Sequence, residues 1–120
     1  MESKELLEKI VQIADGKKAE NLIALDIRDL SIISDYFLIA SADTGRQVQA
    51  IAEEIIDQLH KKGILASHVE GLGEDDWVLL DYGDVVVHLF TTEKRDYYKL
   101  EHLWSEAKTV DLSDWITAEF

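Results

Sequence analysis

The sequence predicts an α/β fold of the mixed α+β kind, in which helices pack on a mixed five-stranded sheet. Three segments carry apolar residues at helical spacing, and five short segments rich in aliphatic and aromatic residues lie between them. The last two short segments are separated by two residues, which is typical of an antiparallel hairpin. The predicted order is helix, two strands, helix, three strands, helix, and we expect the strands joined by the central helix to run parallel.

Length and charge limit what the chain can do. Its 120 residues leave room for one domain, 1–120, since a second hydrophobic core would need its own buried surface. The 12 Lys and Arg against 25 Asp and Glu give a net charge of −13. A field of this sign repels phosphate backbones, so we expect no direct DNA binding, whereas a basic protein would be attracted.

Cysteine and membrane signals are both missing from the sequence. Without cysteine the chain has no disulfide, no thiolate metal ligand and no cysteine nucleophile. The first residues lack the cationic and apolar regions of a secretory signal, and no apolar run approaches the ~20 residues that span a bilayer. We therefore expect a cytoplasmic protein that does not contact membranes.

Periodicity and capping residues predict the first two helices. Ser3 is a candidate N-cap for the first helix, and Gly16 is a candidate stop. The second helix begins at Thr44, which with Gln47 matches a capping box, and it ends at Gly63. The apolar stripe of the second helix consists of Val48, Ile51, Ala52, Ile55, Ile56 and Leu59.

Short apolar segments predict the strands, and renewed helical spacing predicts a terminal helix. The strands are expected at 22–27, 36–40, 64–69, 77–82 and 85–91. Gly83 and Asp84 join the last two as a hairpin loop. Residues 110–120 read as a mixed tail. The positions that predict the terminal helix are Tyr97, Leu100, Leu103, Trp104 and Ala107.

The predicted hairpin has two different faces, because opposed residues of a hairpin point to the same side of a sheet. One face is aliphatic and suits the core: Val78, Leu80, Tyr82, Val85, Val87 and Leu89. The other face carries Trp77, Leu79, Asp81, Val86, His88 and Phe90. Aromatic anchors beside a few polar groups are typical of a protein contact surface. The alternative is that the terminal helices cover this second face, with His88 and Asp81 paired to each other or to backbone.

Patterns for catalysis or metal binding are weak. The four histidines, His60, His68, His88 and His102, do not have the spacing of a zinc site. The turn at 41–46 could hold an anion at a helix N-terminus, but it lacks the glycines and the lysine of a phosphate loop. The acidic turn at 74–76 could bind a cation, but such turns are by default solvated. Asp81 and Asp84 could share a metal ion, but the pattern places no third carboxylate beside them. We expect no catalytic residue, no cofactor and no metal.

Four blocks of sequence, in order and covering nearly the whole chain, resemble the Iojap-like ribosomal silencing factors. The blocks are DYFLIAS at 35–41, RQVQAIA at 46–52, EG at 70–71 with WVLLDYGDVVVHLF at 77–90, and YKLEHLW at 98–104. Residues 42–45 depart from the Gly-Thr/Ser-Ser type of stretch expected there, so the role of the Asp43-Thr44-Gly45 turn is not assigned.

The resemblance implies a non-enzymatic repressor of translation. Such a factor binds the large ribosomal subunit through its fourteenth protein, blocks joining of the small subunit when nutrients are short, has a fold similar to nucleotidyltransferases, and forms a homodimer when free. We expect the partner-binding residues to be Trp77, Asp81, Tyr82, His88 and Phe90, with Trp77 as the leading anchor. The pairing argument places Tyr82 on the aliphatic face, where it would support the hairpin instead.

Two other functions stay open at this stage. A nucleotidyltransferase-like enzyme would need a Gly-Ser turn and two aspartates one residue apart to hold metal ions, and neither is found in the sequence. An adaptor that recruits a different partner through the same face is the second alternative.

Overall fold

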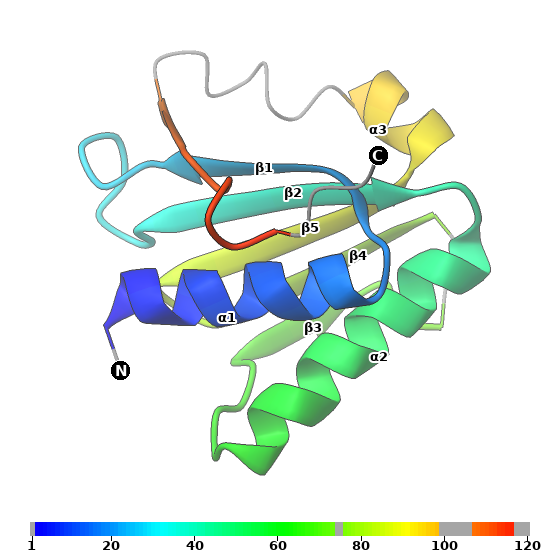
Figure 1. The fold of residues 1–120 in the computed structure, drawn as a ribbon, viewed down its shortest axis with the longest axis horizontal. Helices are drawn as coiled ribbons and strands as arrows, with labels where there is room; N and C mark the ends of the chain where they lie inside the picture. Colours follow the sequence, from blue (N-terminus) through cyan, green and yellow to red (C-terminus); the bar gives the residue numbers. More distant parts are fainter. Residues whose placement is uncertain (1, 74–75, 99–106, 117–120) are drawn as a thin grey trace.

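The computed structural model describes residues 2–73, 76–98 and 107–116 and shows a mixed sheet with two of its helices on one face (Figure 1). In these residues the elements are α1 (Ser3–Gly16), β1 (Glu20–Asp26), β2 (Tyr36–Ala42), α2 (Gly45–Lys61), β3 (His68–Glu70), β4 (Trp77–Asp81), β5 (Val85–Thr91), α3 (Thr92–Tyr98) and β6 (Lys108–Val110). The α+β class predicted from the sequence is confirmed.

The strands form one sheet in the order β3-β4-β5-β2-β1-β6. The central pair, β2 and β5, is parallel, and the neighbouring pairs on either side are antiparallel. The strands joined by α2, which are β2 and β3, run in the same direction as predicted. They are not neighbours, however, because β5 and β4 lie between them.

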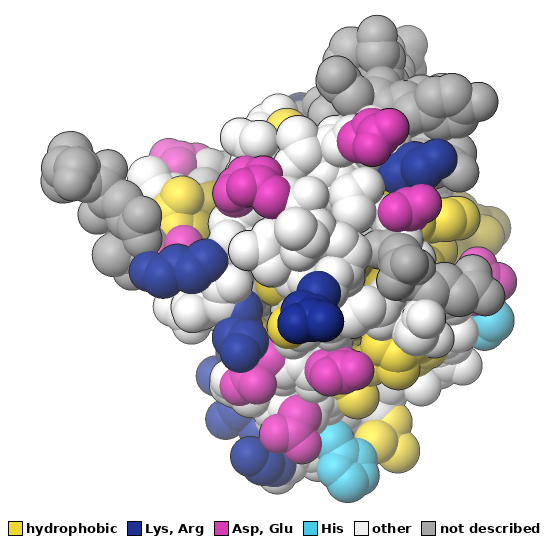
Figure 2. All heavy atoms as spheres, turned by 90° about the vertical axis from the view of Figure 1, so that its right-hand side faces the viewer, with side chains coloured by type: hydrophobic (Ala, Val, Ile, Leu, Met, Phe, Trp, Pro, Cys, Tyr) yellow, Lys and Arg dark blue, Asp and Glu magenta, His cyan; other side chains and the backbone are white. Residues whose placement is uncertain are grey.

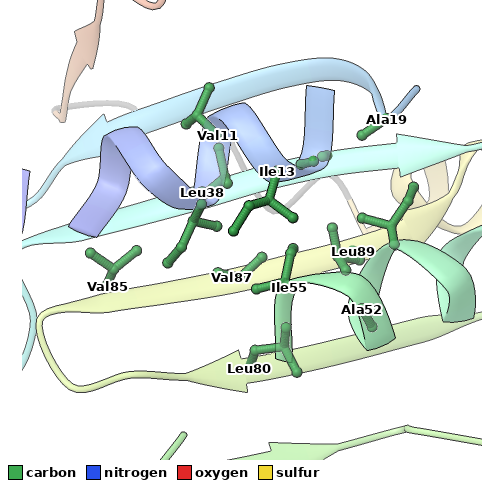
Figure 3. Close-up of a cluster of buried hydrophobic side chains, with 14 of the residues drawn as sticks. Val11, Ile13, Ala19, Leu38, Ala52, Ile55, Leu80, Val85, Val87 and Leu89 are labelled. Atoms are coloured by element: carbon green, nitrogen blue, oxygen red, sulfur yellow. The ribbon is translucent and has the colours of Figure 1, made fainter. Parts of the chain in front are cut away.

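Helices α1 and α2 lie side by side against one face of the sheet, and the main core fills the space between the helices and the sheet (Figures 1 and 3). Side chains of β2, β4 and β5 meet the apolar stripes of both helices there. On the opposite face a smaller cluster forms around Leu25, Ile27, Ile39 and Phe90. Alternate residues of the central strands therefore belong to different cores.

The predicted N-cap of α2 is correct, whereas the predicted N-cap of α1 is not. At α2, Gln47 N donates to Thr44 Oγ1 and Thr44 N donates to Gln47 Oε1, so the capping box is confirmed. The Ser3 prediction is wrong: Ser3 is the first helical residue of α1, and Glu2 is the N-cap without a side-chain hydrogen bond.

Several boundaries also differ from the prediction. The sheet has a sixth strand, β6, because residues 108–110, at the junction of the predicted terminal helix and the predicted tail, pair with β1. The predicted strand 64–69 is reduced to His68–Glu70, since only these residues pair with β4. In the described residues α3 ends at Tyr98; Leu100, Leu103 and Trp104 lie outside the described residues, and Ala107 packs against the smaller cluster instead of continuing a helix. None of the described helices is long and apolar enough to cross a bilayer.

A tight glycine turn holds the loop before β4. Gly71 has a φ of +81°, and a Cβ atom at this position would overlap the carbonyl oxygen of Trp77. The side chain of Gln49 fixes the same turn, because its Nε2 donates to Gly71 O at 3.2 Å and its Oε1 accepts from Gly73 N at 2.7 Å. Glycine is therefore required where the loop passes beside Trp77.

We predict that Gly71→Ala lowers the free energy of unfolding by about 3 kcal/mol, through left-handed strain together with overlap against backbone. Gly63→Ala is the matched control, because Gly63 has a similar φ of +79° but open space around it. The Gly63→Ala variant should lower the free energy of unfolding by about 1 kcal/mol, from left-handed strain alone. Urea unfolding of the two variants measures the difference, and equal losses would contradict the close approach to Trp77.

Candidate partner-binding surface

The predicted hairpin register is confirmed. Trp77 lies opposite Phe90, Leu79 opposite His88 and Asp81 opposite Val86. The aliphatic members of the hairpin belong to the main core beneath the helices. Trp77, His88 and Phe90 are therefore placed on the other side of the sheet, away from α1 and α2.

Aromatic rings form a stacked group on this second face. The Trp77 and Phe90 rings are almost parallel, with centroids 5.8 Å apart, and His88 lies 6.3 Å from each ring. Phe37 of β2 meets His88 edge-on at 5.2 Å. Phe90 and His88 are buried, whereas 36% of Trp77 is exposed. The group therefore presents a tryptophan to solvent on a platform of packed rings.

His88 is a buried imidazole with little polar support. It is 6% exposed, and neither ring nitrogen has a hydrogen-bond partner within the described parts of the chain. Burial lowers the pKa of His88 to about 4, so the ring is neutral near pH 7. The alternative expected the terminal helices to cover this face and His88 and Asp81 to pair with each other or with backbone. Asp81 does bond to backbone, but in the described residues His88 pairs with neither, and α1 packs on the opposite face.

Asp81 lies at the other end of β4 from Trp77, about 13 Å along the strand. Its Oδ1 accepts a hydrogen bond from Gly83 N at 2.8 Å and so fixes the hairpin turn. Its carbonyl oxygen accepts from both N and Oγ of Ser67. The local role of Asp81 is to hold the turn and the edge of the sheet together.

Tyr82 packs against the main core, on the face where the pairing argument placed it. Burial raises the pKa of its hydroxyl to about 12. The structure therefore brings together three of the five predicted partner-binding residues, Trp77, His88 and Phe90, and separates Asp81 and Tyr82 from them. The sequence analysis missed Phe37. Its position in an apolar strand was visible, but its contact with His88 depends on the β2–β5 pairing.

The described residues hold no group of three or more His, Asp or Glu side chains that could bind a metal ion. In the 41–46 turn, the Thr44 side chain is engaged in capping α2. Fold and surface together define an α+β domain with a partly exposed tryptophan and stacked aromatic rings on the face of the sheet away from α1 and α2.

Comparisons with known proteins identify the family. Residues 1–119 match the family model described as "Ribosomal silencing factor during starvation". The chain is 46% identical over 112 residues to "Ribosomal silencing factor RsfS" of Bacillus subtilis, covering 93% of this chain and 95% of that one. A mouse relative, "Mitochondrial assembly of ribosomal large subunit protein 1", is 28% identical over 116 residues, which cover 94% of this chain and 51% of the relative.

A solved structure agrees with these matches. A crystal structure of a protein from Bacillus halodurans has a TM-score of 0.82 and 44% identity, covering 91% of this chain and 99% of that one. The chain belongs to the ribosomal silencing factor family, which includes the plant Iojap proteins and consists of ribosome-binding factors and not of enzymes. The resemblance in the four sequence blocks is thereby confirmed.

We predict that His88 makes the protein less stable in mild acid. The unfolded chain protonates His88 near pH 6.5, but the folded chain does so only near pH 4, so folding becomes less favourable as the pH falls between these values. The loss should reach about 3 kcal/mol near pH 4. The melting temperature of the wild type should therefore fall more steeply between pH 6.5 and pH 4 than that of His88→Phe, which keeps a ring in the stack but has no group to protonate.

His60→Phe is the control, because His60 is exposed on α2. This variant should keep the wild-type pH dependence. Parallel curves for the wild type and His88→Phe between pH 6.5 and pH 4 would show that burial of His88 does not set the acid response.

Proposed function

We propose that this protein binds the large ribosomal subunit through its fourteenth protein and so blocks joining of the small subunit. The protein would act in the cytoplasm, and it would lower the rate of translation when nutrients are short. Family membership supports ribosome silencing, and the printed name of the mouse relative supports the large subunit as the target. The fourteenth protein is the partner that the family resemblance implies.

The observation that carries the proposal is the partly exposed Trp77, whose ring stacks on Phe90 and His88. Large aromatic side chains at the centre of an interface commonly supply much of its binding energy. Stacking on Phe90 and His88 holds the Trp77 ring in place before the partner arrives. A preorganised ring loses less conformational entropy on binding than a free side chain does.

The net charge favours a basic partner. A chain with a net charge of −13 attracts a Lys- and Arg-rich ribosomal protein and is repelled by bare rRNA. Figure 2 shows acidic and basic side chains interspersed on the face turned toward the viewer, with most of the basic ones toward the left and lower left of the view. Direct contact with a protein of the subunit is therefore favoured over contact with its RNA.

The proposal includes the fold likeness to nucleotidyltransferases that the resemblance implies, without their chemistry. The paired aspartates of such enzymes are missing from the sequence, and the family is not enzymatic. An adaptor with a different partner remains the competing hypothesis, which the experiment below distinguishes.

We further propose that the free protein is a homodimer whose contact surface includes Trp77. A tryptophan that is 36% exposed above packed aromatic rings is costly to leave in water. The rings of Trp77, His88, Phe90 and Phe37 form what we call the ring surface. If this surface serves both self-association and partner binding, the two compete. The free dimer would then have to open before it binds the ribosome.

We predict that excess protein lowers the fraction of joined particles when purified small and large subunits are mixed and separated on a sucrose gradient. Trp77→Ala should need about thirtyfold more protein for the same effect, since losing a central aromatic anchor commonly costs ~2 kcal/mol. The circular dichroism spectrum of Trp77→Ala should stay close to that of the wild type, because the ring is partly exposed.

Leu65→Ala serves as the control, because Leu65 is a 68% exposed apolar residue outside the ring surface. It should inhibit joining like the wild type. If the wild type at saturating concentration leaves the gradient unchanged, the silencing proposal fails; if Trp77→Ala is folded and fully active, the assignment of the anchor fails.

We predict that light scattering gives the mass of a dimer for the free protein at micromolar concentration. Adding the fourteenth large-subunit protein should replace the dimer by a one-to-one complex, because both contacts use the Trp77 surface. A two-to-two complex would disprove the shared surface while leaving the dimer intact. A free monomer would disprove both.

A further inference from the structure

The loop between β1 and β2, residues 27–35, is ordered by its own hydrogen bonds. Ile27 N donates to Asp35 O at 2.9 Å and closes the base of the loop. The N atoms of Leu30 and Ser31 both donate to Ile27 O at 2.9 Å. Ser31 Oγ then accepts from Ile33 N at 3.1 Å, so the backbone of the tip has a defined shape.

This ordered loop exposes its apolar side chains. Ile32 is fully exposed, Ile33 is 82% exposed, and Leu30 is 41% exposed. None of the three belongs to either hydrophobic cluster of the described residues. The fold does not use them, and adjacent isoleucines in water are typical of a surface that is covered by another molecule.

The loop is attached to the hairpin turn. Ser34 Oγ donates to Gly83 O at 2.7 Å, and the N atoms of Asp35 and Tyr36 donate to Asp84 O at 2.8 and 3.0 Å. Figure 1 shows the loop at the end of the sheet away from α3. Since β4 and β5 run from this end to Trp77 and Phe90, the isoleucines lie about 20 Å from the aromatic rings.

The exposed isoleucines lie at an end of the sheet that carries several carboxylates and two cations. Arg28 donates to both carboxylate oxygens of Asp26, at 2.9 and 2.7 Å, and Lys108 lies opposite Asp26 across the β1–β6 pair. The loop and the hairpin turn carry four further aspartates, and none of them forms an ion pair with a described cation, although Asp35 interacts electrostatically with Arg28: Asp29, Asp35, Asp81 and Asp84. With Asp26, these carboxylates outnumber the two cations.

We propose that this loop end is a second contact with the large subunit, in which Ile32 and Ile33 enter an apolar depression on a basic protein surface. The inference rests on the proposed function and deepens it, because the factor would then attach at two points along the hairpin. Lysines and arginines around the depression would face the four aspartates. Charge complementarity of this kind speeds association and selects the partner.

The same charges disfavour other occupants. A second copy of the chain placed against this end would bring carboxylates against carboxylates. An anionic lipid surface would be repelled for the same reason. A basic protein with an apolar depression could contact both the isoleucines, Ile32 and Ile33, and the four aspartates at the same end of the sheet, which we call the acidic rim.

The test measures affinity of the full chain for purified large subunits, for the wild type and for the double variant Ile32→Ser with Ile33→Ser. Both side chains are exposed, so folding should be unchanged, and the affinity should fall by about tenfold or more. Leu65→Ser, an exposed apolar residue on the loop after α2, is the matched control and should bind like the wild type.

A second pair of variants tests the acidic rim. Asp29→Asn with Asp84→Asn should bind more weakly and should lose affinity less steeply as salt is raised, because fewer charges then face the partner. Glu53→Gln on α2 removes a charge elsewhere and should leave the salt dependence close to that of the wild type.

The outcomes separate this inference from the proposed function. If the wild type does not bind large subunits, the proposed function fails and the inference with it. If the wild type binds, Trp77→Ala weakens binding and the isoleucine variant binds normally, the loop contact is wrong while the function stands. If the isoleucine variant changes only the mass seen by light scattering, the loop belongs to the dimer and the inference is overturned.

Discussion

The parallel pairing of β2 with β5 is the constraint on which the rest of the structure depends. It joins residues 36–42 to residues 85–91 through seven consecutive pairs at the centre of the sheet. All seven side chains of β5 are buried, because the strand has a core on each side. Both the packing of the helices and the shape of the opposite face follow from this register.

A shift of one residue in this pairing would move every side chain of a strand to the wrong face. In the observed register, Leu38 and Val87 lie beneath the helices, while Ile39 and His88 point the other way. The same register places Phe37 beside His88. The ring surface under Trp77 is therefore a consequence of the central pairing, and not a separate feature added to the fold.

Exposed apolar side chains lie at both ends of the sheet, as the proposed binding without chemistry would require. At one end a tryptophan stands on buried rings, one of which is an imidazole that burial keeps neutral near pH 7. At the other end an ordered loop presents isoleucines among aspartates. The proposed attachment to the ribosome would explain why a small acidic domain of this family keeps such side chains exposed.

Residue types and their local spacing were enough to predict the capping box at Thr44, the hairpin register, the placement of Tyr82 on the core face, the acidic charge and the family. The tertiary structure alone decided which distant strands pair, that residues 108–110 add β6 beside β1, and that Phe37 joins the ring surface. It also decided that Ile32 and Ile33 stay exposed, although apolar residues in the sequence suggest burial. The physical reason is that hydrogen bonds within a turn or a helix end depend on local residue types. Pairing across some fifty residues depends instead on how all the apolar faces can be buried at once.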